Sequence, residues 1–167
     1  IFLQKINLIY NNNNIKKLFV KYFIQQSDKY YYNEFHFKEY VMIIDLRKPE
    51  HAYFYGFALT DGHLREGTRN RGSLSIEVAI RDTELLQKFK TLFEVNSIYK
   101  ERFRETNFTS KKKAGYCSFS IYDLNFRNEL KEYGFPVGKK SNIISPPLKE
   151  FSEIDFIRGL IDGDGSV

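Results

Sequence analysis

The sequence contains a single cysteine, Cys117, among its 167 residues. One cysteine excludes an internal disulfide framework and a zinc site built from several cysteines, so the composition gives no sign of secretion. Long apolar runs are also missing, since stretches such as residues 40–44 are far too short to span a bilayer. The N-terminus has no signal-peptide pattern. We therefore expect a soluble intracellular protein with no membrane partner.

The charge of the chain is moderately basic. Its 26 Lys and Arg residues against 21 Asp and Glu residues give a formal net charge of +5. The basic excess lies in residues 1–150, and residues 151–167 are acidic. A basic domain suggests a polyanionic partner, most often nucleic acid. The chain starts at Ile1 rather than at methionine and stops after "DGDGSV", so we expect a fragment of a longer reading frame.

Residues 1–48 are predicted to form a helical N-terminal extension. Asn14 can cap a first helix whose apolar residues fall on one stripe, and a second helix follows Asn33. Two short helices in a basic segment leave two interpretations open. One is a DNA-binding helix-turn-helix, and the other is a plain helical extension.

From Pro49 onward the patterns alternate between helix and strand. Helices are predicted over residues 49–62, after Asp82, after Asp123 and after Ser152, where Phe151 and Phe156 stand at the positions of a hydrophobic staple. Strands are predicted over residues 63–71, 73–80, 97–104 and 116–122. This order predicts an α+β fold in which helices cover one face of an antiparallel sheet.

Two segments of the chain repeat each other. "FYGFALTDG" at residues 54–62 aligns with "IRGLIDGDG" at residues 157–165 in a register of 103 residues. Each copy has two small residues four apart, which form a smooth patch where another helix can approach closely. These interface residues are Gly56, Thr60, Gly159 and Gly163.

If the two patches pack on each other, Asp61 and Asp164 emerge side by side at the two helix ends. A helix C-terminus carries partial negative charge, so two carboxylates there call for a cation. Mg²⁺ or another divalent cation, held by carboxylates, carbonyl oxygens and water, meets that need and can promote phosphodiester hydrolysis. Taken singly, each copy is an ordinary Asp-Gly turn. The duplication favours the metal interpretation.

The two copies resemble the paired signature helices of LAGLIDADG homing endonucleases, and "GLIDGDG" at residues 159–165 is a close match to that motif. The first copy departs from the motif at Leu59. The resemblance implies an αββαββα lobe with a saddle-shaped sheet over residues 49–150. It also implies that residues 151–167 are the second motif helix, at the start of a second lobe from the same longer chain or, failing that, from a homodimer partner.

The activity implied by the resemblance is site-specific cleavage of double-stranded DNA with Mg²⁺ as cofactor. Asp61 and Asp164 are then the catalytic metal-binding acids, with carbonyls of Thr60 and Gly163 as further ligands. Arg65 and Arg81 are candidates for the auxiliary basic catalytic residues of the family. Such enzymes are encoded in introns or inteins, so the expected location is a bacterial or phage-host cytoplasm, a mitochondrion or a chloroplast.

The strand pattern also predicts which residues face DNA. They lie on the strand faces opposite the apolar positions, or in the turns between strands, where Arg, Lys and Ser contact base edges and phosphates. This set comprises Arg65, Arg69, Arg71, Ser73, Ser75, Glu77, Lys100, Arg102, Arg104, Lys111, Lys112, Lys113, Tyr116, Ser118 and Ser120.

Two other functions compete with the nuclease. One is a DNA- or RNA-binding protein of the same fold that cleaves nothing, such as an intron maturase or a transcription regulator. The retained acids Asp61 and Asp164 argue against it. The other is a basic α+β domain whose repeats are only packing helices.

Overall fold

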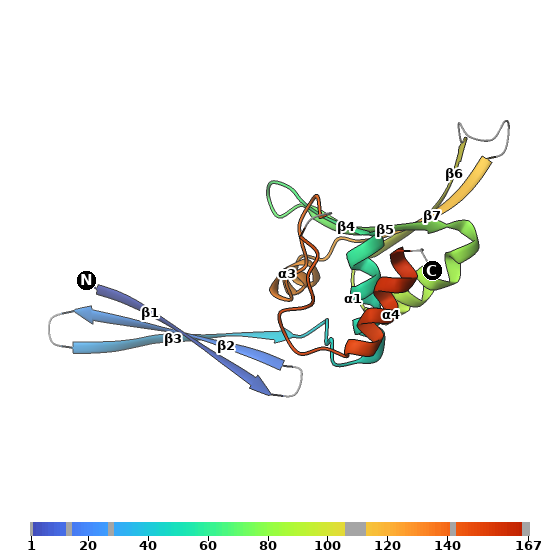
Figure 1. The fold of residues 1–167 in the computed structure, drawn as a ribbon. Coiled ribbons are helices and arrows are strands. Elements are labelled where there is room, and N and C mark those ends of the chain that lie inside the picture. The colour runs from blue at the N-terminus through green and yellow to red at the C-terminus, as the bar shows by residue number, and fades with distance from the viewer. Residues whose placement is uncertain (1, 13–14, 27–28, 106–112, 141–142, 165–167) are drawn as a thin grey trace. The chain divides into compact units, whose positions relative to one another are not determined.

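The computed structural model describes residues 2–12, 15–26, 29–105, 113–140 and 143–164. The chain divides into two compact units, Ile1–Met42 and Ile43–Val167. Figure 1 shows the elements of both units in chain order. Each unit is described by itself.

The first unit is a three-stranded antiparallel sheet, not a pair of helices. Its strands are β1 (Phe2–Asn12), β2 (Ile15–Gln26) and β3 (Lys29–Val41), in the order β1-β2-β3. The prediction of a helical extension is therefore wrong for these residues, and so is the helix-turn-helix alternative. The segment is rich in Ile, Val, Phe and Tyr, which favour strands. Its apolar stripe matched a helix only because short apolar runs fit both periods.

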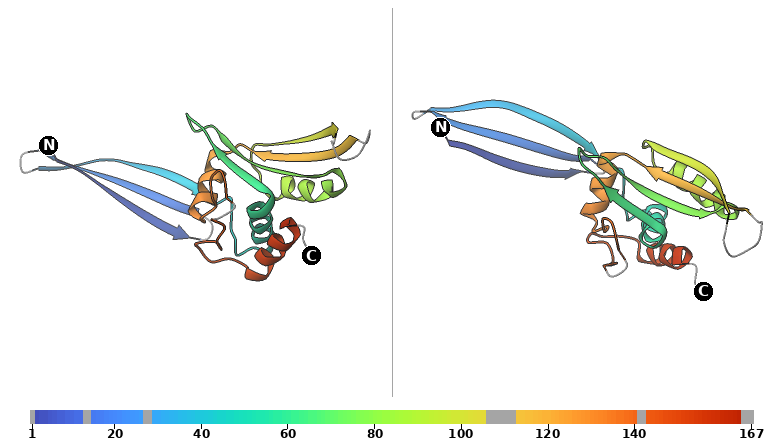
Figure 2. Two further views of the ribbon diagram at one scale, coloured as in Figure 1. Left: turned by 45° about the horizontal axis from the view of Figure 1, so that its top comes forward. Right: turned by 90° about the horizontal axis from the view of Figure 1, so that it is seen from above.

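The second unit is α+β, as expected. It contains four helices among its described residues, which are α1 (Pro49–Asp61), α2 (Thr83–Leu92), α3 (Leu124–Glu132) and α4 (Glu153–Asp164), with a short 3₁₀ turn η1 (Ile80–Asp82) before α2. Its strands are β4 (Gly62–Glu66), β5 (Gly72–Ala79), β6 (Ser97–Glu105) and β7 (Lys113–Ile121). All are antiparallel, in the order β4-β5-β7-β6 (Figure 2). β4 is shorter than the predicted strand over residues 63–71, because the chain turns at residues 67–71.

Most predicted helix signals are confirmed. The Asp123 carboxylate accepts a hydrogen bond from the Phe126 amide at 2.8 Å, which caps α3. Before α4, the Ser152 hydroxyl bonds the Asp155 carboxylate at 2.8 Å, and the rings of Phe151 and Phe156 pack 5.1 Å apart. Asp82 occupies the cap position of α2, but its side chain makes no capping hydrogen bond.

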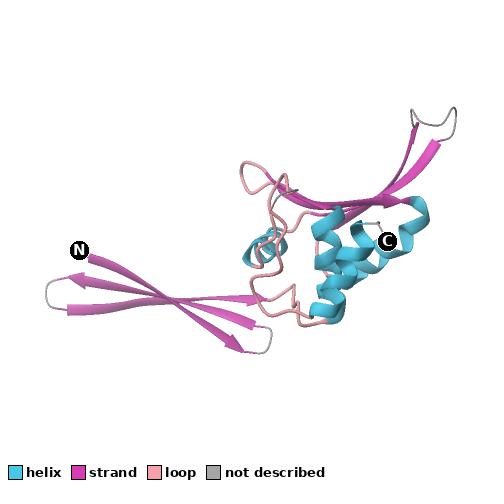
Figure 3. Cartoon of the chain, in the orientation of Figure 1, coloured by secondary structure: helices cyan, strands magenta, loops and turns pink. Residues whose placement is uncertain are grey.

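α1, α2 and α3 lie against one face of the sheet, as Figure 3 shows. Strand residues of that face are buried, among them Leu74, Ile76, Cys117, Phe119 and Ile121. A cluster of aromatic rings joins three helices: Phe54 of α1 lies 4.9 Å from Phe89 of α2 and 4.8 Å from Phe93, which in turn lies 4.9 Å from Phe126 of α3. This core holds α1 under the sheet.

α4 packs against α1 through the small residues that the sequence repeat singled out. A methyl group added at Gly56 would collide with the carbonyl oxygen of Phe156, and one at Gly159 would collide with the carbonyl oxygen of Tyr53. Gly56 and Gly159 are 103 residues apart, and so are their contact residues Tyr53 and Phe156. The two close contacts therefore involve equivalent positions of the repeat. The helix pair is therefore reciprocal, with each copy presenting the same surface to the other. The small residues of the repeat therefore lie where α1 and α4 approach each other.

This close approach yields a stability prediction for Gly159→Ala. On an isolated helix the change is stabilising by about 1 kcal/mol, because alanine is the better helix former. Here we expect the opposite sign, a loss of about 1 to 3 kcal/mol in the free energy of unfolding, because the new methyl group forces the backbones apart. Urea denaturation followed by circular dichroism measures it.

The control is Gln87→Ala on α2, where the side chain is exposed and lies outside the helix pair. That change is expected to shift the free energy of unfolding by no more than about 0.5 kcal/mol. A Gly159→Ala variant as stable as the parent protein would show that the backbones are not in contact at this position.

Candidate metal centre and nucleic-acid interface

Asp61 and Asp164 are the last residues of α1 and α4. α1 ends there because Gly62 turns into β4, and the Gly62 amide caps the helix by donating to the carbonyl of Ala58. At the same level the helices touch: a Cβ added at Gly163 would overlap the Thr60 hydroxyl, which donates to the Phe57 carbonyl at 2.8 Å. Reciprocal packing thus brings both aspartates to one end of the helix pair (Figure 1).

The two carboxylates interact electrostatically. The pKa of Asp61 is raised above its usual value, first because the protein desolvates the carboxylate. Lys140 opposes this rise, whereas the negative charge of Asp164 adds to it. Burial and a second acid both disfavour the ionised form of a carboxylate. A cation bound nearby stabilises that form, so such a carboxylate favours cation binding.

Lys140 supplies one such positive charge, although it is not among the site residues predicted from the sequence. Its ammonium donates to the Ala58 carbonyl at 3.1 Å and to the Gly62 carbonyl, both at the C-terminal end of α1. Burial lowers its pKa to about 8, and the Asp61 carboxylate limits that fall. The loop that carries it is tied to β4, since the Gly138 amide donates to the Leu64 carbonyl at 2.8 Å.

The two carboxylates at the helix ends would provide oxygen ligands to a metal. Among the described residues, no three His, Cys, Asp or Glu side chains gather into a metal-binding group. Backbone oxygens and water are the further ligands expected of a metal held by Asp61 and Asp164. That all-oxygen set fits Mg²⁺ rather than Zn²⁺. The expected carbonyl ligands Thr60 and Gly163 adjoin the two aspartates in the chain.

Asp162, the other acid of the second repeat, has a different role. It accepts a hydrogen bond from the Tyr53 hydroxyl of α1 at 2.8 Å, and so joins the two helices. The pKa of Tyr53 is raised to about 12, mainly by burial and further by this bond. Asp162 is therefore an interhelical contact that stabilises the pair.

The two arginines proposed as auxiliary residues lie in different places. Arg65 is exposed on β4, which begins directly after Asp61. Arg81 lies in η1, and its exposed guanidinium pairs with the neighbouring Asp82 at 3.4 Å. The cation that acts on the pKa of Asp61 is Lys140.

The strand register gathers most of the predicted DNA-facing residues on the sheet face away from the helices. Neighbouring positions across the strands are Arg65 with Ser73, Ser75 with Ser120, Glu77 with Ser118, Lys100 with Ser118, and Arg102 with Tyr116. Ser73 is only 5% exposed, so its hydroxyl lies largely below this surface. Arg69 and Arg71 lie in the turn between β4 and β5 and are exposed.

Some members of the predicted set cannot be placed on this face. Lys111 and Lys112 lie outside the described residues, while Arg104 and Lys113 are placed only as strand positions. His63 and Ile98 belong to the face, because they oppose Ser75 and Ser120. Residues two apart on a strand share a face, so this alternation places His63 with Arg65 and Ile98 with Lys100 and could have predicted both.

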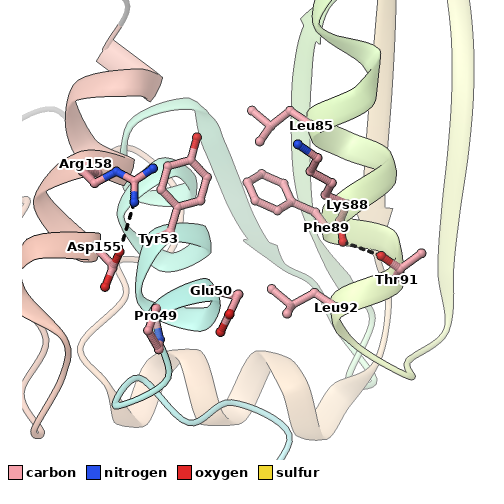
Figure 4. A pocket seen from close by; sticks show the side chains of 10 residues that line it. All are labelled: Pro49, Glu50, Tyr53, Leu85, Lys88, Phe89, Thr91, Leu92, Asp155 and Arg158. Carbon is pink, nitrogen blue, oxygen red and sulfur yellow. Dashed lines mark hydrogen bonds and ion pairs between the residues drawn. The ribbon is translucent and has the colours of Figure 1, made fainter.

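A separate pocket of about 580 Å³ lies where α1, α2 and α4 meet. Figure 4 shows its apolar floor of Tyr53, Leu85 and Phe89, and the ion pair between Arg158 and Asp155 at its edge. None of the residues that line it belongs to the predicted site.

No protein-family model matches the sequence. In the part of the chain that the structure describes, no helix has the length and apolar character needed to cross a membrane.

The electrostatics around Asp61 predict the direction of two pKa changes. Lys140→Met should raise the pKa of Asp61, because the opposing positive charge is lost, and Asp164→Asn should lower it, because a negative charge is lost. Carboxyl ¹³C chemical shifts recorded against pH measure both. Lys139→Met, at the adjacent exposed position, serves as the control. An unchanged Asp61 titration in both test variants would mean that the three groups do not interact.

Proposed function

We propose that this chain belongs to a site-specific, Mg²⁺-dependent DNA endonuclease of the LAGLIDADG type. The observation that carries the proposal is the reciprocal helix pair. Two helices with the same small-residue contacts each end in an aspartate, and the carboxylates are close enough for one to raise the pKa of the other. A packing repeat alone requires the small residues, but it does not require an acid at both helix ends.

In the proposed reaction Asp61 and Asp164 hold Mg²⁺ or another divalent cation, with carbonyl oxygens of Thr60 and Gly163 completing the protein ligands. The cation supplies Lewis acidity at the phosphodiester and lowers the pKa of an attacking water. Lys140 fixes the end of α1 through the Ala58 and Gly62 carbonyls. Its positive charge offsets the negative charge of Asp61. The same charge is available to a phosphate oxygen that gains negative charge in the transition state.

The polar sheet face would bind the duplex. Arg65, Lys100 and Arg102 suit phosphates and guanine edges, whereas the hydroxyls of Ser75 and Ser120, which lie 3.0 Å apart, suit adaptable base contacts. The helix pair lies beneath this sheet, so DNA on the outer face would reach the aspartates at the margin where β4 starts.

Cutting both strands requires a second sheet on α4, and the exposed side of α4 supports one. Ile154, Ile157 and Ile161 are 75%, 51% and 47% exposed. Their counterparts in α1, 103 positions earlier, are His51, Phe54 and Ala58, which are buried in the core of the unit. We propose that a lobe built like residues 49–150, from a longer form of the chain or from a second copy, covers these isoleucines.

A non-cleaving DNA- or RNA-binding protein remains the second candidate, and one observation favours it. Lys140 already places a positive charge beside Asp61, so the helix ends do not depend on a metal for charge balance. The two candidates differ in whether Asp61 and Asp164 bind a divalent cation.

The nuclease makes a direct prediction about the two acids. The chain should bind Mn²⁺, which is used as a paramagnetic substitute for Mg²⁺. The bound ion should broaden the carboxyl NMR signals of Asp61 and Asp164. Asp61→Asn and Asp164→Asn should each remove that binding. In a form that carries the second lobe, they should also abolish Mg²⁺-dependent cleavage of a randomised duplex library, because each acid is a metal ligand in the reaction. The 167-residue chain alone is expected to show little or no specific cleavage.

Duplex binding by the same variants is the control, since the asparagines lie outside the DNA-facing surface and should leave it intact. Cleavage that persists in both variants would contradict the assignment of the acids. Duplex binding without Mn²⁺ binding would favour the non-cleaving protein. A chain that binds neither duplex nor Mn²⁺ would leave the repeats as packing helices only.

A further inference from the structure

The tip of the β4–β5 hairpin, residues 67–71, has a backbone that its sequence disfavours. The Arg71 amide donates to the Thr68 carbonyl at 3.2 Å, and the residues between them, Arg69 and Asn70, have φ values of 57° and 59°. Two successive positive φ angles define a type I′ turn, for which Asn-Gly and Gly-Gly are the usual pairs. Arginine is rarely found in this conformation because its Cβ is crowded there. Something outside the turn must hold it.

Arg127 of α3 provides that hold. Its side chain is buried, and its Nη2 donates to the Asn70 carbonyl at 2.6 Å. Its Nη1 lies 3.7 Å from the Glu66 carboxylate at the end of β4. On the other strand, a Cβ at Gly72 would meet the Arg65 carbonyl oxygen first and would also come within 2.6 Å of Nη1, so glycine at this position leaves room for both the paired strand and the guanidinium. One side chain thus contacts both strand ends and the turn.

The stability of the fold does not explain this arrangement. The Nε of Arg127 is buried and has no hydrogen-bond partner among the described residues. A buried guanidinium with incomplete pairing stabilises a protein poorly, and an apolar side chain of similar size often does as well or better. The contacts that Arg127 makes fix the conformation of the hairpin tip. The exposed side chains of this tip include Arg69 and Arg71.

We propose that Arg127 is a positioning residue that locks the hairpin tip, so that Arg69 and Arg71 form a preorganised contact for nucleic-acid phosphates. This inference rests on the proposed binding of duplex DNA by the sheet face. Preorganisation matters because a flexible turn loses conformational entropy when its arginines bind. The backbone of a locked turn is already ordered, so binding loses less entropy.

The salt dependence of binding tests the proposal. The full chain is titrated with a fluorescein-labelled random duplex of about 30 base pairs at several NaCl concentrations, because the slope of log K against log salt counts phosphate contacts. Arg69→Gln and Arg71→Gln should each reduce that slope by about one. Arg127→Met should reduce it by about one to two, although its side chain is buried.

A double-mutant cycle then identifies the route. In the Arg127→Met background, Arg69→Gln should have little further effect, because Arg69 is no longer held in place. Adding Asn70→Gly to Arg127→Met should restore part of the slope, because glycine adopts the positive φ at position 70 without strain and so favours the turn that also holds Arg69. If Arg127 served only to pack α3, the Asn70→Gly change would not restore the slope.

Two controls separate this effect from loss of charge and loss of stability. Lys131→Met removes the neighbouring cation of α3, which bonds Glu66 at 2.6 Å, without touching the turn. Leu130→Ala opens a cavity in the core beside Arg127. Both should leave the slope unchanged in the folded protein. Arg127→Lys provides a second test variant should Arg127→Met fail to fold, and it should lower the slope in the same direction.

The outcomes are distinguishable. If the parent chain does not bind the duplex at low salt, the proposed function fails. If Arg69→Gln lowers the slope and neither Arg127 variant does, binding stands and the positioning role of Arg127 is refuted. If Arg69→Gln and Arg71→Gln leave the slope unchanged, the hairpin tip is not part of the interface.

Discussion

The structure of the second unit depends on the contact between the backbones of α1 and α4. Glycines at positions 56 and 159 let each helix approach the carbonyl groups of the other, and no larger side chain fits there without moving the backbone. Everything at the helix ends follows from this approach. The aspartates lie together because two copies of one surface pack reciprocally, and the Tyr53–Asp162 hydrogen bond joins the same pair.

Bringing two carboxylates to the C-terminal ends of helices is electrostatically costly, since the helix dipoles are negative there. The chain offsets part of that cost with Lys140, whose ammonium binds carbonyls at the end of α1. The centre therefore combines acids that attract cations with one resident cation. That balance is compatible with the proposed metal site, and it equally permits a binding protein that holds no metal.

The local patterns of the second unit predicted the order and type of its helices and strands, although β4 ends earlier than its pattern suggested. Alternation in β5 and β7 identified the buried faces, and the Asp123 cap and the Phe151–Phe156 staple marked two helix starts. The same reasoning failed for residues 1–48, where aromatic and β-branched residues fitted a helical stripe but form strands. Strand pairing depends on partners elsewhere in the chain, so a short apolar run does not reveal it.

By itself, the sequence determined the repeat, the small residues at its interface and the two acids that end it. These could be predicted because a repeat carries the same spacing into the same local structure twice. Only the tertiary structure decided which side chains act on those features. Lys140 reaches Asp61, and Arg127 reaches the turn at Asn70, across long stretches of chain, and no periodicity records such contacts. They arise because the packed core of the sheet and helices places each of these cations beside a backbone carbonyl that is distant in the sequence.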